Sequence, residues 1–383
     1  MPELFEDKSE KKVEYIELIY DLIFVYLVSR NGDLLHTIEG GFIRPMAFFS
    51  YTASTLIILQ VWYYSTVLIN RYGRGKLAEF VGIFINMYLL YYMADGIRDD
   101  WGVTYTRYHL AWALILVNLA VQYLILLRRG DWADGAERRH MRYQLSLLLA
   151  QAAVALVSIP IYHRTGAALG PRAMVLGFAA TLLCRRTEDA APLDFGHLSE
   201  RVMLYIVFTF GEMILGIAGY FASDFDGWTM YYSLMAFLIV AGLFSSYGTF
   251  YNSLLDRERT GVSGGGYMLL HIVMILALNN ITAAMEFMRV SEIAAVPKNL
   301  FMVASLLVYY LCLLLTQPYA RTRAAGGRRF YRKVAANFGV YGVLMAVFYR
   351  SAPVSIALTM VFIGFQLYAL RRGGRDRPDL PEE

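Results

Sequence analysis

Long apolar stretches, separated by short polar and mostly basic loops, follow one another along the chain. Most are close to the roughly 20 residues that an α-helix needs to cross the hydrocarbon core of a bilayer. The pattern therefore predicts an all-α polytopic helical membrane protein. About 12 transmembrane helices are expected, at residues 14–30, 42–70, 77–97, 105–127, 141–162, 168–184, 197–221, 228–253, 267–288, 298–318, 330–349 and 351–370.

The spacing of these segments also predicts an internal duplication. The shift that places Glu17 on Glu200 superposes the first six segments on the last six, and places one basic loop on another. Six spans are an even number, so the halves would form a parallel 6+6 repeat about an axis along the membrane normal. The expected parts are a cytoplasmic N-terminal tail (1–13), a first six-helix repeat (14–184), a cytoplasmic linker (185–196), a second six-helix repeat (197–370) and a cytoplasmic C-terminal tail (371–383).

Composition and charge agree with a bilayer as the main partner. Hydrophobic residues make up 57% of the chain and charged residues 17%, against about 25% charged in soluble proteins. The net charge is +4, but the basic residues lie in short loops and form no continuous stripe, so we expect no nucleic-acid partner. Under the positive-inside rule, their bias to one side predicts that both termini are cytoplasmic. The pattern gives no oligomeric state.

The cysteines give no sign of a disulfide or a metal site. Cys184 and Cys312 both lie in apolar segments, and neither has a second Cys or a His at metal-binding spacing. We therefore predict two buried thiols, no metal and no cofactor.

The segment at 14–30 carries three acids on one helical face: Glu14, Glu17 and Asp21. Glu14 is expected at the membrane interface, where a carboxylate suits the start of a helix. Glu17 fits either that interface or a functional site. Asp21 lies about 10 Å further along the helix than Glu14. An acid at that depth needs a cavity or a cationic partner.

The segment at 197–221 carries His197, Glu200 and Arg201 at its start and Glu212 about 18 Å beyond Glu200, near the expected midplane. The i, i+3 spacing of His197 and Glu200 occurs in metal-binding helices, but an interfacial histidine is favoured because no second histidine lies nearby. Glu200 and Arg201 are expected to close a polar loop with Glu17 or Asp21. For Glu212, contact with a proton, cation or substrate is favoured over a purely structural hydrogen bond.

One more buried titratable group is expected at His271. A histidine near its solution pKa can exchange protons in the physiological range. A hydrogen-bonded core histidine is the favoured interpretation, and proton exchange is the alternative.

Three stretches resemble the bacterial low temperature requirement A (LtrA) membrane proteins: EYIELIYDLIFVYLV at 14–28, GHLSERVMLYIVFTFGEMIL at 196–215 and YMLLH at 267–271. The motif positions of that family fall on Glu17 and Asp21, on His197, Glu200 and Arg201, and on Gly211-Glu212. The chain differs from the usual motif at Ile19-Tyr20, Met203 and Phe210. The resemblance implies a multi-pass protein of the bacterial cytoplasmic (inner) membrane, without implying a reaction.

Three functions fit these features. The favoured one is a secondary transporter for a small molecule or ion with proton coupling. In it Asp21 and Glu212 would line a cavity, Glu212 would take the proton, and Arg201 or His271 would be the charge partner. The second is a structural or regulatory membrane protein. The third is an intramembrane enzyme with Glu200 or Glu212 as acid or base, and it is least favoured because the sequence shows no nucleophile with a neighbouring base.

Overall fold

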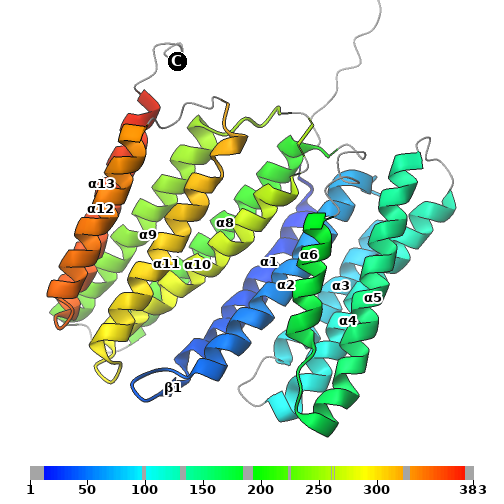
Figure 1. The fold of residues 1–383 in the computed structure, drawn as a ribbon, viewed down its shortest axis with the longest axis horizontal. Helices are drawn as coiled ribbons and strands as arrows, with labels where there is room; N and C mark the ends of the chain where they lie inside the picture. Colours follow the sequence, from blue (N-terminus) through cyan, green and yellow to red (C-terminus); the bar gives the residue numbers. More distant parts are fainter. Residues whose placement is uncertain are drawn as a thin grey trace, which may run out of the picture. The chain divides into compact units, whose positions relative to one another are not determined.

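The computed structural model describes residues 13–96, 101–129, 135–183, 193–222, 226–259, 261–262, 264–321 and 328–375. Within these ranges the chain is almost entirely helical, and a helix lies over each of the predicted segments (Figure 1). The helices are α1 (Tyr15–Gly32), α2 (Pro45–Tyr72), α3 (Leu77–Asp95), α4 (Trp101–Arg129), α5 (Gly135–Thr165), α6 (Gly170–Leu183), α8 (Phe195–Ala218), α9 (Gly227–Ser253), α10 (Gly265–Arg289), α11 (Ala295–Leu315), α12 (Arg328–Val347) and α13 (Ala352–Arg375).

Nine of the helices in the described part of the chain are long and apolar enough to cross a membrane. The remaining three are α1, α6 and α12. Helix α1 carries two acids and an arginine, α6 has only 14 residues, and α12 begins with a basic turn. The apolar, multi-helix character of the chain is therefore established, while the number of crossings and the 6+6 repeat stay predictions.

The chain forms two compact units, each assembled from separate stretches of sequence. The first comprises Met1–Leu27, Leu56–Tyr205 and Arg257–Gly266; the second comprises Val28–Thr55, Ile206–Asp256 and Tyr267–Glu383. Helices α1, α2 and α8 each contribute residues to both units, and so does α10 with its first two residues. Of the predicted tails and linker, residues 1–12, 184–192 and 376–383 lie outside the described residues, and with them Cys184.

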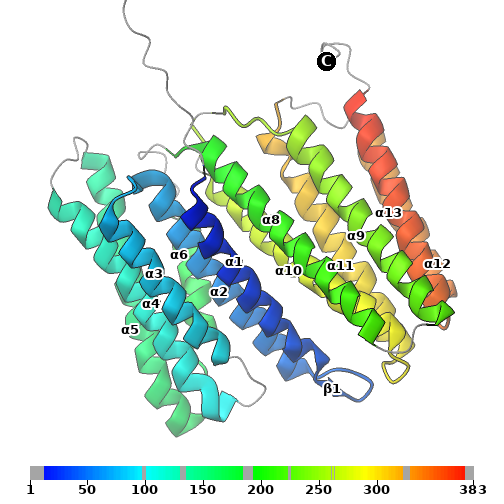
Figure 2. The same cartoon turned by 180° about the vertical axis from the view of Figure 1, so that it is seen from behind.

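In the first unit α3, α4, α5 and α6 pack as successive neighbours, as both views of the fold show (Figures 1 and 2). Buried side-chain amides form hydrogen bonds between α2, α5 and α6. Gln60 Nε2 of α2 donates to the carbonyl of Met174 at 2.9 Å, and Gln151 Nε2 of α5 donates to Gln60 Oε1 at 3.1 Å. Such interhelical hydrogen bonds are each worth about 1 kcal/mol or less in membrane bundles.

In the second unit α13 packs against both α9 and α12 (Figure 2), and α12 also contacts α11. Between α1 and α2 lies the 3-10 helix η1 (Asp33–His36), followed by a two-stranded hairpin of β1 (Ile38–Glu39) and β2 (Phe42–Ile43). The turn is Gly40-Gly41, with φ of 61° and 85°. Positive φ at both turn positions is the geometry of a type I′ hairpin and favours glycine there.

Candidate functional site

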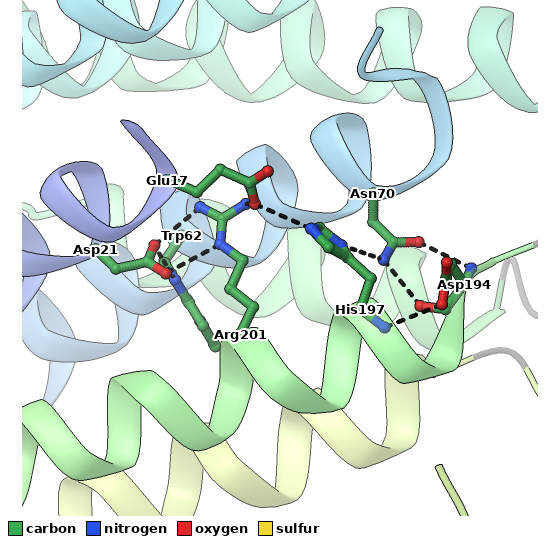
Figure 3. A network of polar contacts seen from close by, with 7 residues as sticks. All are labelled: Glu17, Asp21, Trp62, Asn70, Asp194, His197 and Arg201. Atoms are coloured by element: carbon green, nitrogen blue, oxygen red, sulfur yellow. Dashed lines mark hydrogen bonds and ion pairs between the residues drawn. The ribbon is translucent and has the colours of Figure 1, made fainter. Parts of the chain in front are cut away.

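Four charged or titratable side chains of the first unit meet in one place (Figure 3). Glu17 and Asp21 come from α1 and His197 and Arg201 from α8, each pair at i, i+4 and so on one helical face. We call these four residues the buried charge cluster. All four are at most 2% exposed.

Arg201 is the centre of the buried charge cluster. Its Nε donates to Asp21 Oδ2 at 3.0 Å and its Nη2 to Asp21 Oδ1 at 2.8 Å, which is a two-pronged pair. Its Nη1 lies 3.1 Å from Glu17 Oε2. One guanidinium therefore serves two carboxylates, as its planar fork of donors allows. The ion pair expected between Arg201 and the acids of α1 is present, and Asp21 has the cationic partner that its depth requires.

Further polar contacts hold Asp21 at one end of the cluster and His197 at the other. Trp62 of α2 donates its indole N–H to Asp21 Oδ1 at 2.9 Å. At the opposite end, Asn70 Nδ2 lies 3.0 Å from His197 Nδ1, and His197 Nε2 lies 3.4 Å from Glu17 Oε2. Asp194 Oδ1 accepts the backbone N–H of His197 at 2.9 Å, which caps the start of α8.

The amide of Asn70 determines which nitrogen of His197 carries the proton. Asn70 Nδ2 donates to the carbonyl of Asp194, and Asn70 Oδ1 accepts from the N–H of Asp194, so the amide cannot be turned over. Asn70 is therefore a donor toward Nδ1 of His197. A neutral His197 must then carry its hydrogen on Nε2, the nitrogen that lies 3.4 Å from Glu17 Oε2.

Glu17 also lines a cavity of about 100 Å³ in the first unit. A site for one water needs about 10–15 Å³ on this measure, so several waters fit. The cavity lies at the ends of α1, α2, α3 and α4, with mostly apolar walls and Glu14, Arg74 and Arg129 among its charged residues. Its lining includes Glu17 and does not include Asp21. Glu17 thus contacts the buried charge cluster and also lines the cavity, whereas Asp21 belongs to the cluster alone.

The other predicted site residues lie outside the cluster. Glu200 and Glu212 are half-buried, and neither makes a hydrogen bond or ion pair with any part of the chain that the structure describes. His271 is buried in α10, where its Nδ1 hydrogen-bonds the carbonyl of Tyr267 at 2.8 Å and its Nε2 lies 3.3 Å from the hydroxyl of Tyr247. These are the contacts of a hydrogen-bonded core histidine.

Sequence reasoning missed Trp62, Asn70 and Asp194. Asp194 carried a readable signal, because an Asp directly before a helix and three residues before His197 is a common N-cap pattern. Trp62 and Asn70 carried none, since a single Trp or Asn in an apolar helix most often only packs or holds helices together. Across the described ranges, no three His, Cys, Asp or Glu side chains are placed to hold a metal ion. Cys312 is a buried free thiol.

The fold and the site define a polytopic helical membrane protein with a buried, four-residue charge cluster. The sequence places it more closely: residues 12–369 match the bacterial low temperature requirement A protein (LtrA) family, and the chain belongs to that family. The resemblance seen in the three sequence stretches is confirmed. No curated protein and no solved structure matches the chain.

Proposed function

We propose that the protein is a proton-coupled secondary transporter of the bacterial inner membrane, with both termini in the cytoplasm and a small molecule or ion as substrate. The observation that supports this most is the double role of Glu17. It contacts Arg201 and His197 of the buried charge cluster, and it also lines the cavity. A proton that enters the cavity can therefore reach a carboxylate that helps to hold α1 to α8.

The coupling step follows from the charges around Arg201. When Glu17 is ionised, Arg201 binds both Glu17 and Asp21. When Glu17 takes up a proton, its attraction to Arg201 Nη1 is lost, while Asp21 keeps its two-pronged pair with the same guanidinium. Protonation thus removes the ion pair of Glu17 with Arg201, which is one of the polar ties between α1 and α8. A ligand or proton that favours one of two helix arrangements in this way shifts the population between them.

Two more acids fit this scheme. Asp21 acts as the permanent counter-ion of Arg201, because it is fully buried and has three hydrogen-bond donors. Glu212 lies about 16 Å from Arg201 along the same helix. A half-buried carboxylate at that depth, with no polar partner in the described residues, suits a second proton or cation contact.

A structural or regulatory role is the second candidate, and the closure of the cluster at Asp21 favours it. A carboxylate with 0% exposure and three donors has no remaining need for a substrate. In that case the cluster would only fix α1 against α8 and α2.

Proton flux in reconstituted liposomes separates the two candidates. With a panel of small solutes and a pH-sensitive dye inside, we expect solute-dependent flux in the wild type and at least a tenfold loss in Glu17→Gln and Glu212→Gln. The matched control is Glu258→Gln, at an exposed glutamate without a polar partner in the described chain. Variants that keep wild-type flux contradict the coupling role. If Glu17→Gln lowers only the thermal stability and no solute drives flux, the structural role stands.

A further inference from the structure

The cavity in the first unit has the chemistry of a binding site for an amphipathic molecule. Its walls are mainly apolar, with Ile16, Leu68, Ile83 and Leu126 buried along them. Its volume of about 100 Å³ gives room for part of an alkyl chain. Each methylene of a ligand that the apolar walls remove from water makes the free energy of binding more favourable by about 0.8 kcal/mol.

The charged side chains of the lining differ in how far they are exposed. Glu17 contacts Arg201, and Glu79 Oε2 accepts the backbone N–H groups of Arg74 and Lys76 at 2.8 and 3.4 Å. Glu14, Arg74 and Arg129 are exposed. The accessible charges of the lining therefore include one carboxylate and two guanidinium groups.

Glu14 lies beside the loop that joins α2 to α3. Gly75 of that loop has a φ of +64°, and a Cβ built there would come within 3.6 Å of Glu14 Oε1. The loop also carries Arg74, while Arg129 is the last residue of α4. A carboxylate and two guanidinium groups thus line the same small cavity, and a ligand headgroup that carries both signs would complement their charges.

Exposed apolar side chains also lie in and next to the segments that line the cavity. Ile125 lines the cavity and is 37% exposed, and Leu77 and Val81 of α3 are 78% and 49% exposed. Exposed apolar side chains on a membrane helix indicate contact with acyl chains. A bilayer lipid therefore has both the position and the apolar part that the cavity requires.

We infer that this cavity binds a bilayer phospholipid whose headgroup carries a primary ammonium group. An acyl chain lies along the apolar walls, the phosphate binds the guanidinium groups of Arg129 and Arg74, and the ammonium donates to the carboxylate of Glu14. Guanidinium and phosphate form strong charge-assisted hydrogen bonds. A purely anionic headgroup would meet the negative charge of Glu14, and a quaternary ammonium has no N–H to donate to it.

The inference concerns binding and holds whether or not the protein transports a solute. A lipid in this place would cover Glu17, which lines the cavity. If the proposed function is correct, the lipid composition would then control access of protons to the buried charge cluster.

Native mass spectrometry of the full-length protein tests the inference. The purified protein is delipidated in detergent and titrated with phosphatidylethanolamine, phosphatidylcholine and phosphatidylglycerol of identical acyl chains. We expect the first phosphatidylethanolamine molecule to bind at least fivefold more tightly than either of the others. In Glu14→Gln this preference should fall below twofold, because the acceptor for the ammonium has lost its charge.

Two arginine variants complete the design. Arg129→Gln should weaken all three lipids by at least threefold, because each carries the phosphate. Arg139→Gln is the matched control, since Arg139 is exposed at the start of α5 and does not line the cavity. Both Glu14 and Arg129 are exposed, so neither variant should disturb folding.

Two results would overturn the inference: equal binding of the three lipids by the wild type, or a preference for phosphatidylethanolamine that Glu14→Gln leaves unchanged. Tighter binding of phosphatidylglycerol than of the other two, lost in Arg129→Gln, would show an anionic-lipid site in its place. None of these measurements depends on proton flux, so a failure of the transporter proposal leaves this test intact, and the reverse also holds.

Discussion

Arg201 is the buried cation around which the charged side chains of the first unit are arranged. It is fully buried, and its Nε, Nη1 and Nη2 contact Asp21 and Glu17, which are themselves at most 2% exposed. Removing several charges from water costs several kcal/mol for each ion, and their attraction recovers this only when the geometry is good. The two-pronged pair with Asp21 and the indole N–H of Trp62 provide that geometry.

Replacing Arg201 should therefore destabilise the protein strongly. We expect Arg201→Gln to lower the free energy of unfolding by about 3–5 kcal/mol, because it leaves two buried carboxylates without a cation. Asp21→Asn combined with Arg201→Gln should cost less than the sum of the single changes. Thermal or denaturant unfolding in detergent, arranged as a double-mutant cycle, measures this coupling. Strictly additive costs would show that the pair does not contribute as a unit.

At the scale of elements, the linker between α1 and α2 is attached to α10 and α11 within the second unit. The carbonyl of Gly41 accepts the N–H of Ala294 at 2.7 Å, and the ring of Phe42 contacts the rings of Phe287 and Phe301. His36 of η1 adds a polar tie, with Nε2 3.2 Å from Glu286 Oε2. The linker is thus attached to α10 and α11 by a backbone hydrogen bond, by aromatic contacts of Phe42 and by the pair of His36 with Glu286.

The tie between His36 and Glu286 should make stability depend on pH. The hydrogen bond to Glu286 raises the pKa of His36, and the charges of Glu286 and Asp33 act in the same direction, against the effect of burial. A raised folded pKa means that the contribution is fully present below the ordinary pKa of about 6.5. It is lost as the pH rises through the raised value.

The unfolding temperature of the wild type should consequently fall more steeply than that of His36→Gln as the pH rises above about 6.5. The effect should be small, since the His36 side chain is 50% exposed and water screens the pair. His163→Gln is the control, because the partner of His163 Nε2 is the hydroxyl of Thr106 and not a carboxylate. Parallel pH profiles for the wild type and His36→Gln would contradict the assignment.

At the scale of the whole molecule, the distribution of basic loops predicts its orientation. The stretches 128–142 and 321–333, where α4 is connected to α5 and α11 to α12, hold many of the lysines and arginines, and such basic connections stay on the cytoplasmic side. Both termini should then be cytoplasmic, provided that the number of crossings is even.

Fusion reporters test this orientation directly. A fluorescent protein that matures only in the cytoplasm should be bright at either terminus, and alkaline phosphatase, which needs an oxidising compartment, should be inactive at both. Phosphatase activity at one terminus and fluorescence at the other would require an odd number of crossings. The most economical change would then be that one of α1, α6 and α12 does not span the bilayer.

The sequence by itself determined the class of the protein and the positions of its helices. In lipid every backbone N–H and C=O must be paired, and a continuous apolar run of about 20 residues pairs its own backbone groups as a helix, whatever packs against it. The same physics marked Asp21 as a residue in need of a partner, because a lone carboxylate at that depth is costly. Membership of the LtrA family was also visible, in the local motifs of the first and seventh segments.

Only the tertiary structure decided which partner each polar group has. Asp21 and Arg201 are 180 positions apart, so no local periodicity indicates that they meet. Trp62 and Asn70 joined the cluster without a signal of their own, and Glu17, rather than Asp21, lines the cavity. Helical spacing decides which side chains share a face; the packing of that face against other helices decides what each side chain contacts and which of them water can reach.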